Sequence, residues 1–244
     1  MARKKTSLSA GEKLLELYTL MYNKNGYLNW WPGEGVLEIS LGAILTQQTS
    51  WTNVEKAISN LKSKNMLNIE SIVGSDPETL ALLIRPSGYY NQKAKRLKEF
   101  CAFVYYNFGN IENFLSQDTE NLRHLLLSLK GIGPETADSI ILYAAGKPSF
   151  VVDAYTFRIL ERTGVYPEEL VEHGKTRAEL PANILKRDYE ALKSYFEKNL
   201  PKDVKLYNDF HAQFVITGKN WCNKKPVCSG CPLENLCLYR TSIR

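Results

Sequence analysis

Apolar residues recur along most of this chain at intervals of three and four positions, the spacing that places them on one face of an α-helix. The pattern predicts helices over these ranges: 11–22, 36–45, 54–61, 91–108, 119–128, 135–145, 154–163, 187–198 and 204–216. Asp76-Pro77 predicts the start of another helix, because proline is favoured at the first helical position. The two-residue alternation of β-strands is scarce, so we predict an all-α chain of about ten helices.

The helical pattern breaks over residues 164–186, where Pro167, Gly174 and Pro181 predict an irregular connection. FVVDAY at residues 150–155 is the only apolar, β-branched run that could be mistaken for a strand, and its end overlaps the helix predicted at 154–163. No internal repeat or low-complexity segment is evident. A chain of 244 residues is long enough for one large domain or two modest ones.

Composition narrows the class of protein. Hydrophobic residues make up 44% of the chain and charged residues 23%, as in a globular protein. No apolar run approaches the roughly 20 residues that a membrane span requires, and no apolar segment of a secretory signal follows the basic start. We therefore expect no membrane partner and a cytoplasmic location. The net charge of +5 permits a polyanionic partner without requiring one.

The stretch LKGIGPETADSI, residues 129–140, places a glycine turn between two predicted helices. Gly131 and Gly133 would allow positive φ angles and a close approach of the backbone. Such a turn is often only a tight corner between helices. It can also bind a phosphate, because the free N–H groups at the start of the second helix point outward.

Asp153 lies 18 residues after Glu135 and directly precedes a predicted helix. One interpretation is an N-cap, whose carboxylate accepts hydrogen bonds from N–H groups of the first turn. The other is a chemically active carboxylate held opposite the glycine turn. The two roles are compatible, since a capping carboxylate stays ionised and rigid.

The cysteines are unevenly distributed. Cys101 falls within an apolar helical pattern and is expected to be a small buried hydrophobic residue. The other four form the pattern C-x5-C-x2-C-x5-C: Cys222, Cys228, Cys231 and Cys237. In a reducing compartment four thiolates can hold tetrahedral zinc or a [4Fe–4S] cluster. Zinc ribbons usually contain two C-x2-C pairs and this segment contains one, which favours the cluster.

Together, LKGIGPETA, VVDAYTFRILERTG and the four cysteines resemble the helix-hairpin-helix DNA glycosylases of the endonuclease III superfamily, from about Trp30 to Cys237. The resemblance implies a two-lobed fold. A six-helix barrel domain with the hairpin would span 35–147, and a second helical domain would combine 1–34 with 148–244. The second domain would carry the iron–sulfur loop at 222–237. The expected partner is double-stranded DNA containing damaged bases, bound by a monomer that is nucleoid-associated if bacterial or archaeal.

The resemblance also implies roles for single residues. Asp153 would stabilise the developing oxocarbenium ion or help to activate water. The other expected contacts with DNA are the hairpin residues Gly131, Ile132, Gly133 and Thr136, the loop residues Lys224 and Lys225, and Gln48. Hairpin carbonyls in the family often hold a monovalent cation. Gln48 would fill the space of the extruded base, with Gln47 as the nearest competitor for that role. The two loop lysines are equally consistent with plain solvated charge.

Glu135 occupies the position at which bifunctional family members carry a lysine that attacks C1′. A carboxylate cannot form the resulting imine, so we expect a monofunctional enzyme that uses water and has no AP lyase activity. Lys130 and Lys147 remain the neighbouring lysines that could substitute. Without a strong nucleophile, the enzyme would act best on bases that leave easily, such as positively charged alkylated purines.

An electron-rich aromatic pocket suits such a base, because stacked rings attract a flipped cation. WWPGEGVLEISLGAILTQQTSW resembles the pocket region of the 3-methyladenine DNA glycosylases. The resemblance implies that Trp30, Trp31, Pro32 and Trp51 line the base pocket, although a Trp pair before a helix is often only packed. Those enzymes also have glutamate at the lysine position, but their best-known members lack the cysteine loop.

Other interpretations remain open at this stage. The chain could be a bifunctional glycosylase and lyase like endonuclease III, or a glycosylase for mismatched bases or uracil. It could also be a non-catalytic DNA-binding iron–sulfur protein. Lys93, Lys95 and Arg96 are expected on an exposed helix face. The three histidines show no metal-ligand spacing and are expected to be structural, although His211 lies on a late helix that could face the pocket.

Overall fold

The computed structural model describes residues 8–171 and 188–242. The chain divides into two compact units. The central unit is Trp31–Ser149, and the terminal unit combines Met1–Trp30 with Phe150–Arg244. Every regular element assigned within the described residues is helical, as the pattern predicts.

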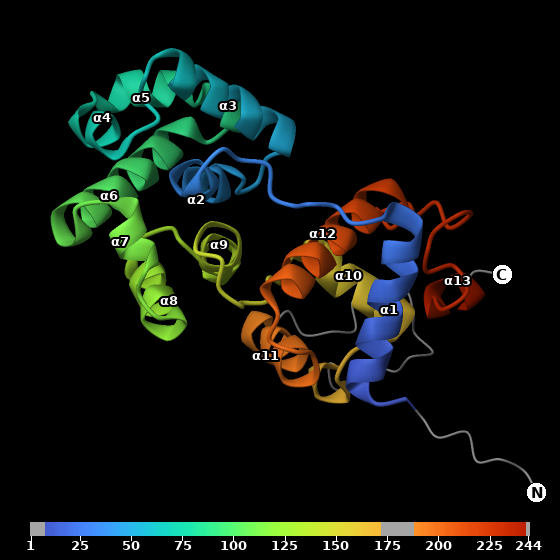
Figure 1. The fold of residues 1–244 in the computed structure, drawn as a ribbon. Coiled ribbons are helices and arrows are strands. Elements are labelled where there is room, and N and C mark those ends of the chain that lie inside the picture. Colours follow the sequence, from blue (N-terminus) through green and yellow to red (C-terminus); the bar gives the residue numbers. More distant parts are fainter. Residues whose placement is uncertain (1–7, 172–187, 243–244) are drawn as a thin grey trace, which may run out of the picture. The chain divides into compact units, whose positions relative to one another are not determined.

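The central unit contains most of the helices (Figure 1). They are α2 (Val36–Leu45), α3 (Trp51–Ser63), α4 (Ile69–Gly74), α5 (Pro77–Leu83), α6 (Tyr90–Phe108), α7 (Ile111–Leu115), α8 (Thr119–Ser128) and α9 (Pro134–Ser139). A 3-10 turn, η1 (Arg85–Ser87), precedes α6. A π-helical segment, η2 (Ile140–Ala144), continues α9, where the pattern predicts one uninterrupted helix over 135–145.

The long helix α6 carries much of the central unit's core. Leu97, Phe100 and Val104 are fully or almost fully buried on the face that meets neighbouring helices, which include α2, α4 and α5. Cys101 is also buried, which confirms the expectation of a small hydrophobic residue. Burial raises the pKa of its thiol to about 12, with a smaller contribution from Glu70, so this thiol stays protonated and inert.

The prediction that Lys93 lies on an exposed face of α6 is wrong, because this residue is only 1% exposed. Its ammonium donates to the carbonyl oxygens of Leu45 at 2.8 Å and Ser87 at 2.7 Å. Burial, followed by the charge of Arg96, lowers the pKa of Lys93 to about 8. A long aliphatic stem can lie in a core while its ammonium satisfies carbonyls at helix ends, and the charge pattern alone does not reveal this. Lys95 is exposed as predicted.

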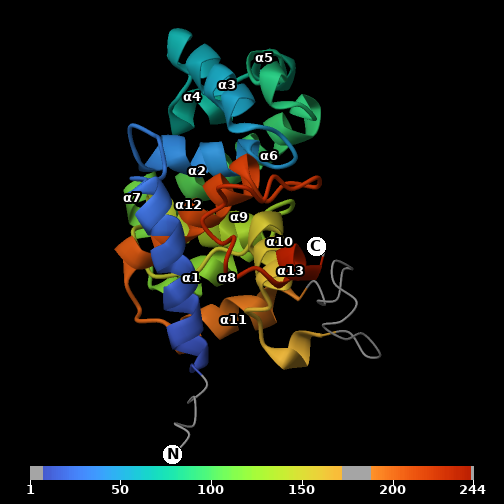
Figure 2. The same ribbon diagram turned by 90° about the vertical axis from the view of Figure 1, so that its right-hand side faces the viewer.

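The terminal unit is built from α1 (Ala10–Asn25), α10 (Ala154–Thr163), η3 (Glu168–Leu170), α11 (Tyr189–Asn199), α12 (Val204–Asn220) and α13 (Leu238–Ser242). Helix α12 packs against α1 and α10, and Figure 2 shows α1 running alongside the terminal unit's other helices. The core is aromatic. The Phe150 and Phe196 rings stack at 3.9 Å between centroids, and Phe210 stacks on Phe214 at 4.9 Å.

The unit boundaries lie at 30/31 and 149/150, a few residues from the predicted 34/35 and 147/148. Side-chain packing explains the shift. Trp31 packs with Trp51, while Phe150 stacks in the terminal core. Of the irregular connection predicted at 164–186, only residues 164–171 are among the described residues. Residue 187 of the helix predicted at 187–198 lies outside them. No helix in the described part of the chain is long and apolar enough to cross a membrane.

Candidate functional site

The glycine turn joins α8 to α9 as a hairpin in the central unit. Gly131 has φ +87°, and a Cβ atom there would lie 2.3 Å from Nε of Arg96, so both backbone angle and space require glycine. Gly133 has φ −93° and open space around its Cβ position, so only Gly131 uses the positive φ that glycine allows. Ile132 is buried, whereas the side chain of Glu135 is exposed on the first turn of α9.

The hairpin is fixed to the end of α2 by Gln47. Its side-chain amide donates to the carbonyl oxygen of Gly131 and to Oγ1 of Thr136, each at 3.0 Å. Its own carbonyl oxygen accepts from Arg96. Thr136 is largely buried, and its hydroxyl is hydrogen-bonded to Gln47 in the same unit. The side chain of Gln47 is therefore engaged within the central unit.

Gln48 is exposed and has φ +56°, an uncommon angle for a residue with a side chain. It lies in the short turn between α2 and α3, where Thr46, at the end of α2, bonds back to the carbonyl of Gly42. A non-glycine residue held at positive φ costs of order 1 kcal/mol, and such residues cluster at functional positions. The geometry agrees with a residue presented outward by a rigid turn.

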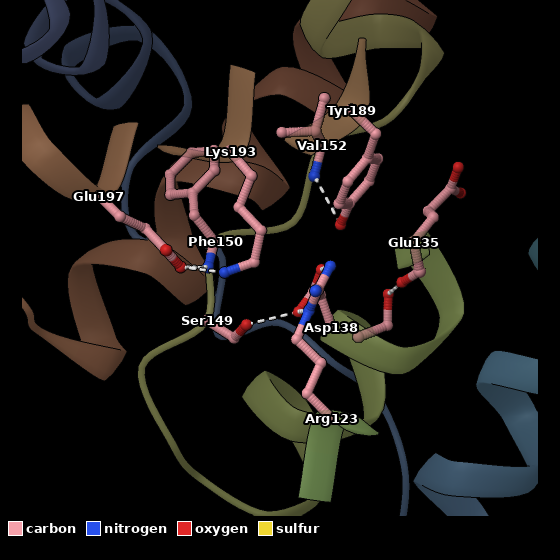
Figure 3. Close-up of polar contacts among 10 residues, drawn as sticks. Arg123, Glu135, Asp138, Ser149, Phe150, Val152, Tyr189, Lys193 and Glu197 are labelled. Carbon is pink, nitrogen blue, oxygen red and sulfur yellow. Dashed lines mark hydrogen bonds and ion pairs between the residues drawn. The ribbon is translucent and has the colours of Figure 1, made fainter. Parts of the chain in front are cut away.

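Buried ion pairs and hydrogen bonds fix the two ends of the segment that leads to Asp153 (Figure 3). Within the central unit, Asp138 is fully buried and accepts from Arg123 at 2.9 and 3.1 Å and from the hydroxyl of Ser149 at 2.6 Å. Within the terminal unit, Glu197 accepts from the backbone N–H of Phe150 at 2.9 Å and pairs with Lys193. Each end of the segment is therefore anchored within its own unit.

Asp153 is the N-cap of α10, which confirms the predicted capping role. Its Oδ1 accepts from the backbone N–H of Thr156 at 2.7 Å and from the Thr156 hydroxyl at 2.9 Å. Its Oδ2 lies 3.7 Å from Nε2 of His211, and the Asp153 side chain is only 11% exposed. Burial alone would raise the pKa of Asp153. Contact with His211 and the bonds from Thr156 outweigh burial, so the pKa is lowered.

The lysines near the hairpin differ in their surroundings. Lys147 donates to the carbonyl oxygens of Leu115 at 2.6 Å and Gln117. An ammonium engaged in this way is a poor nucleophile, because attack needs a free amine lone pair. Lys130 is exposed beside the turn.

The predicted pocket aromatics fall into two groups. In the central unit, the ring of Trp31 lies 5.0 Å from those of Trp51 and Tyr143, edge-on to the former. The indole N–H of Trp51 donates to Glu55 at 2.8 Å, and Pro32 is exposed. Tyr143 is not among the predicted pocket residues; it lies in the π-helical segment η2, where the sequence predicts an ordinary α-helix.

Trp30 belongs to the terminal unit and has the ammonium of Lys219 5.8 Å from its ring centroid. The segment before it is held by α12. Asp209, fully buried, accepts from the backbone N–H of Leu28 at 2.8 Å and from the Tyr18 hydroxyl at 2.9 Å. Gln213 donates to the carbonyl oxygen of Gly26 at 2.8 Å. These buried bonds give the chain a defined path toward Trp30.

The four terminal cysteines line one cavity in the terminal unit. All are free thiols, and α10 supplies basic partners. Arg162 donates to Sγ of Cys222 at 3.1 Å, and Arg158 donates to the carbonyl oxygen of Cys222 at 2.6 Å. Four thiols around one cavity, with a guanidinium on one sulfur, are a donor set that fits a [4Fe–4S] cluster. Among the described residues, no three His, Cys, Asp or Glu side chains surround a single metal-ion position.

Two of these thiols have perturbed pKa values. Burial raises the pKa of Cys231 to about 11 and also raises that of Cys237. Binding of a metal or cluster by these thiols would therefore have to displace their protons. Lys224 and Lys225 are both exposed on the loop between Cys222 and Cys228, as contact with phosphate or plain solvation would each require.

Comparisons with known proteins agree with this geometry. Residues 41–196 match the family model described as HhH-GPD superfamily base excision DNA repair protein. A protein of Methanocaldococcus jannaschii named "Putative DNA repair glycosylase" is 44% identical over 94% of this chain and 97% of its own. Endonuclease III of Thermotoga maritima is 29% identical over 82% of each chain. The chain therefore belongs to the HhH-GPD superfamily and is a DNA glycosylase of the HhH-GPD/endonuclease III superfamily.

Two solved structures extend the comparison. The 3-methyladenine DNA glycosylase of H. pylori, bound to 1,N6-ethenoadenine, is 33% identical with a TM-score of 0.70, covering 87% of this chain and 98% of that one. A non-covalent endonuclease III–DNA complex matches with a TM-score of 0.73 at 20% identity, covering 97% and 99% of the two chains. The second match shows the shared fold, which confirms the predicted all-α helix-hairpin-helix class.

Proposed function

We propose that this protein is a monofunctional DNA glycosylase that hydrolyses the N-glycosidic bond of flipped, alkylated purines such as 3-methyladenine. The observation that carries the proposal is a buried Asp153 with a lowered pKa, combined with Glu135 at the lysine position. An ionised carboxylate can stabilise an oxocarbenium-like transition state or orient water. A glutamate cannot form the imine on which lyase chemistry depends.

The choice of alkylated purines rests on the aromatic residues and on one relative. Trp31, Trp51 and Tyr143 are gathered in the central unit, and aromatic faces attract a cationic base. The H. pylori enzyme, which is similar over nearly its whole length, is named for 3-methyladenine and holds an ethenoadenine. An alkylated purine also leaves readily, which suits an enzyme that relies on water as its nucleophile.

The rest of the proposal concerns DNA contacts and the cofactor. The hairpin at Gly131–Gly133 would bind the DNA backbone through its amides, with a monovalent cation on its carbonyls, and Gln48 would replace the extruded base. Lys224 and Lys225 would contact phosphate. Cys222, Cys228, Cys231 and Cys237 would hold a [4Fe–4S] cluster, whose contribution is to fold and stiffen the loop.

The test is base release from methylated double-stranded DNA, followed by chromatography under single-turnover conditions. We expect release of 3-methyladenine by the wild-type chain. Asp153→Asn should reduce the rate about 100-fold or more, because the amide loses the negative charge that stabilises the transition state. Asparagine is an equally good N-cap, so the variant should keep the start of α10 and lose only the stability that the ionised carboxylate contributes. Undiminished release by Asp153→Asn would overturn the role of that residue.

A further inference from the structure

Helix α12 presents two polar faces to two different parts of the terminal unit. Successive residues are about 100° apart around a helix, so Asp209 and Gln213 share one face while His211 points away from it. Asp209 and Gln213 hold the segment that leads to Trp30. His211 lies seven residues before Gly218, which places both on the same side of α12, two turns apart.

The face with His211 and Gly218 is the one that meets α10. A Cβ atom at Gly218 would lie 2.2 Å from the Tyr155 ring, so the two helices approach as closely as a glycine allows. Tyr155 follows Asp153 by two residues, and the close contact sets the distance between α12 and the start of α10. His211, 6% exposed, then faces the carboxylate across this packed contact.

The two carboxylate oxygens of Asp153 have separate neighbours. Oδ1 takes both bonds from Thr156, the backbone N–H and the hydroxyl. Oδ2 has Nε2 of His211 3.7 Å away. We propose that His211 is the positioning partner of Asp153: its imidazole fixes the second oxygen and keeps the buried carboxylate ionised for catalysis. This role rests on the proposed function of Asp153 in base release.

Electrostatics supports the geometry. Burial is the largest influence on Asp153 and would by itself raise its pKa, while His211 provides the largest opposing influence. Other charged side chains on the neighbouring helices have partners elsewhere. Arg158 and Arg162 donate to the cysteine loop, Asp209 bonds Tyr18 and Leu28, Lys219 lies over Trp30, and Lys193 pairs with Glu197. Glu161 is eight residues beyond Asp153 on α10, about 12 Å along the helix axis.

The direction of the effect follows. Replacing His211 with phenylalanine keeps a buried ring but removes the group that offsets burial, so the pKa of Asp153 should rise. The carboxylate would then be protonated at higher pH, and the acid limb of the kcat profile should move to higher pH. Loss of alignment should also lower kcat at neutral pH by about tenfold.

The experiment measures the pKa of Asp153 directly in the full-length protein, by NMR titration of its carboxyl carbon, assigned with Asp153→Asn. The pH profile for release of 3-methyladenine is recorded in parallel. We expect a raised pKa and a shifted profile in His211→Phe, and an intermediate result in His211→Gln, which retains an N–H donor. Phe214→Leu on the same helix is the control, because it weakens the core without touching Asp153.

An unchanged pKa and an unchanged profile in His211→Phe, with a loss of stability like that of Phe214→Leu, would overturn the proposal and leave His211 as a packing residue. The two readouts also separate the claims. If no base is released by the wild-type chain, the proposed function fails, while the carboxyl titration still decides whether His211 controls Asp153.

Discussion

At the scale of residues, the carboxylate of Asp153 has both a structural role and a proposed chemical role. Asp153 caps α10 with one oxygen and faces His211 with the other. A helix cap usually contributes about 1 kcal/mol of stability, and here it also fixes the orientation of the group that would face the sugar. Because the folded state lowers the pKa of Asp153, its contribution to stability is present above the unfolded pKa and is lost as the pH falls through the folded pKa.

Glu135 supports a second prediction at this scale. In Glu135→Lys a primary amine would replace an exposed carboxylate on the first turn of α9, so the change should be tolerated. The amine can attack C1′ of an abasic site and form an imine, which borohydride reduces to a stable link. We expect trapped complexes with Glu135→Lys and none with the wild-type chain or the Glu135→Gln control. Trapping by the wild-type chain would show that another lysine acts as a nucleophile.

The sequence predicts Asp153 as a cap because an aspartate directly precedes a helical run, and the structure confirms the cap. It does not predict the contact with His211, which comes from a helix 58 residues further along the chain. Lys93 illustrates the same limit. Its position in an amphipathic helix suggests exposure, but carbonyls from two other segments bind its ammonium in the core. Long-range pairs of this kind leave no periodic signal.

At the scale of elements, the hairpin depends on one glycine more than on the other. Gly131→Ala would place a methyl group against Arg96 at a positive φ, and should lower the free energy of unfolding by about 1–3 kcal/mol. The displaced hairpin should also bind DNA with an abasic-site analogue more weakly. Chemical denaturation and a fluorescence binding titration measure the two effects.

Gly133→Ala is the matched control, since its φ is negative and the space around its Cβ position is open. This substitution should lower the free energy of unfolding by less than about 1 kcal/mol. Equal losses of stability and of DNA binding in Gly131→Ala and Gly133→Ala would contradict the structural account of the turn.

The long helices follow from their periodic apolar faces, and most of their bounds lie within a few residues of the predicted ranges. Helices α4, α7 and α13 were missed, because five or six residues are too few to establish a period. Asn68 and Asn110 do cap two of them and were the available signals. The π-helical segment after α9 was also missed, since its apolar residues fit a helix of either kind.

At the scale of the whole molecule, two units with separate cores are made from one chain that crosses between them twice. In the terminal unit, Arg158 and Arg162 of α10 donate hydrogen bonds to backbone carbonyl oxygens of the cysteine loop. A cofactor at the four thiols would therefore stabilise the helix that begins after Asp153, because binding energy at such a site is also folding energy.

Removal of one thiol tests this connection. Cys228→Ser should lose the absorbance near 400 nm expected of a [4Fe–4S] protein and should melt at a lower temperature. Cys101→Ala, which changes a buried thiol in the central unit, should keep the absorbance. A colourless wild-type protein that contains one zinc ion per chain would contradict the cluster assignment.

The central claim is that this chain expels an alkylated purine with water and leaves the DNA strand intact. The most direct measurement incubates the protein with a mixture of duplexes that carry methylated purines, uracil, mismatched thymine or oxidised pyrimidines, and scores released bases and strand nicking in the same samples. The account predicts release of 3-methyladenine in preference to the other bases, with no nicks above the level of an Asp153→Asn control. Preferential release of another base, or nicking that keeps pace with release, would contradict it.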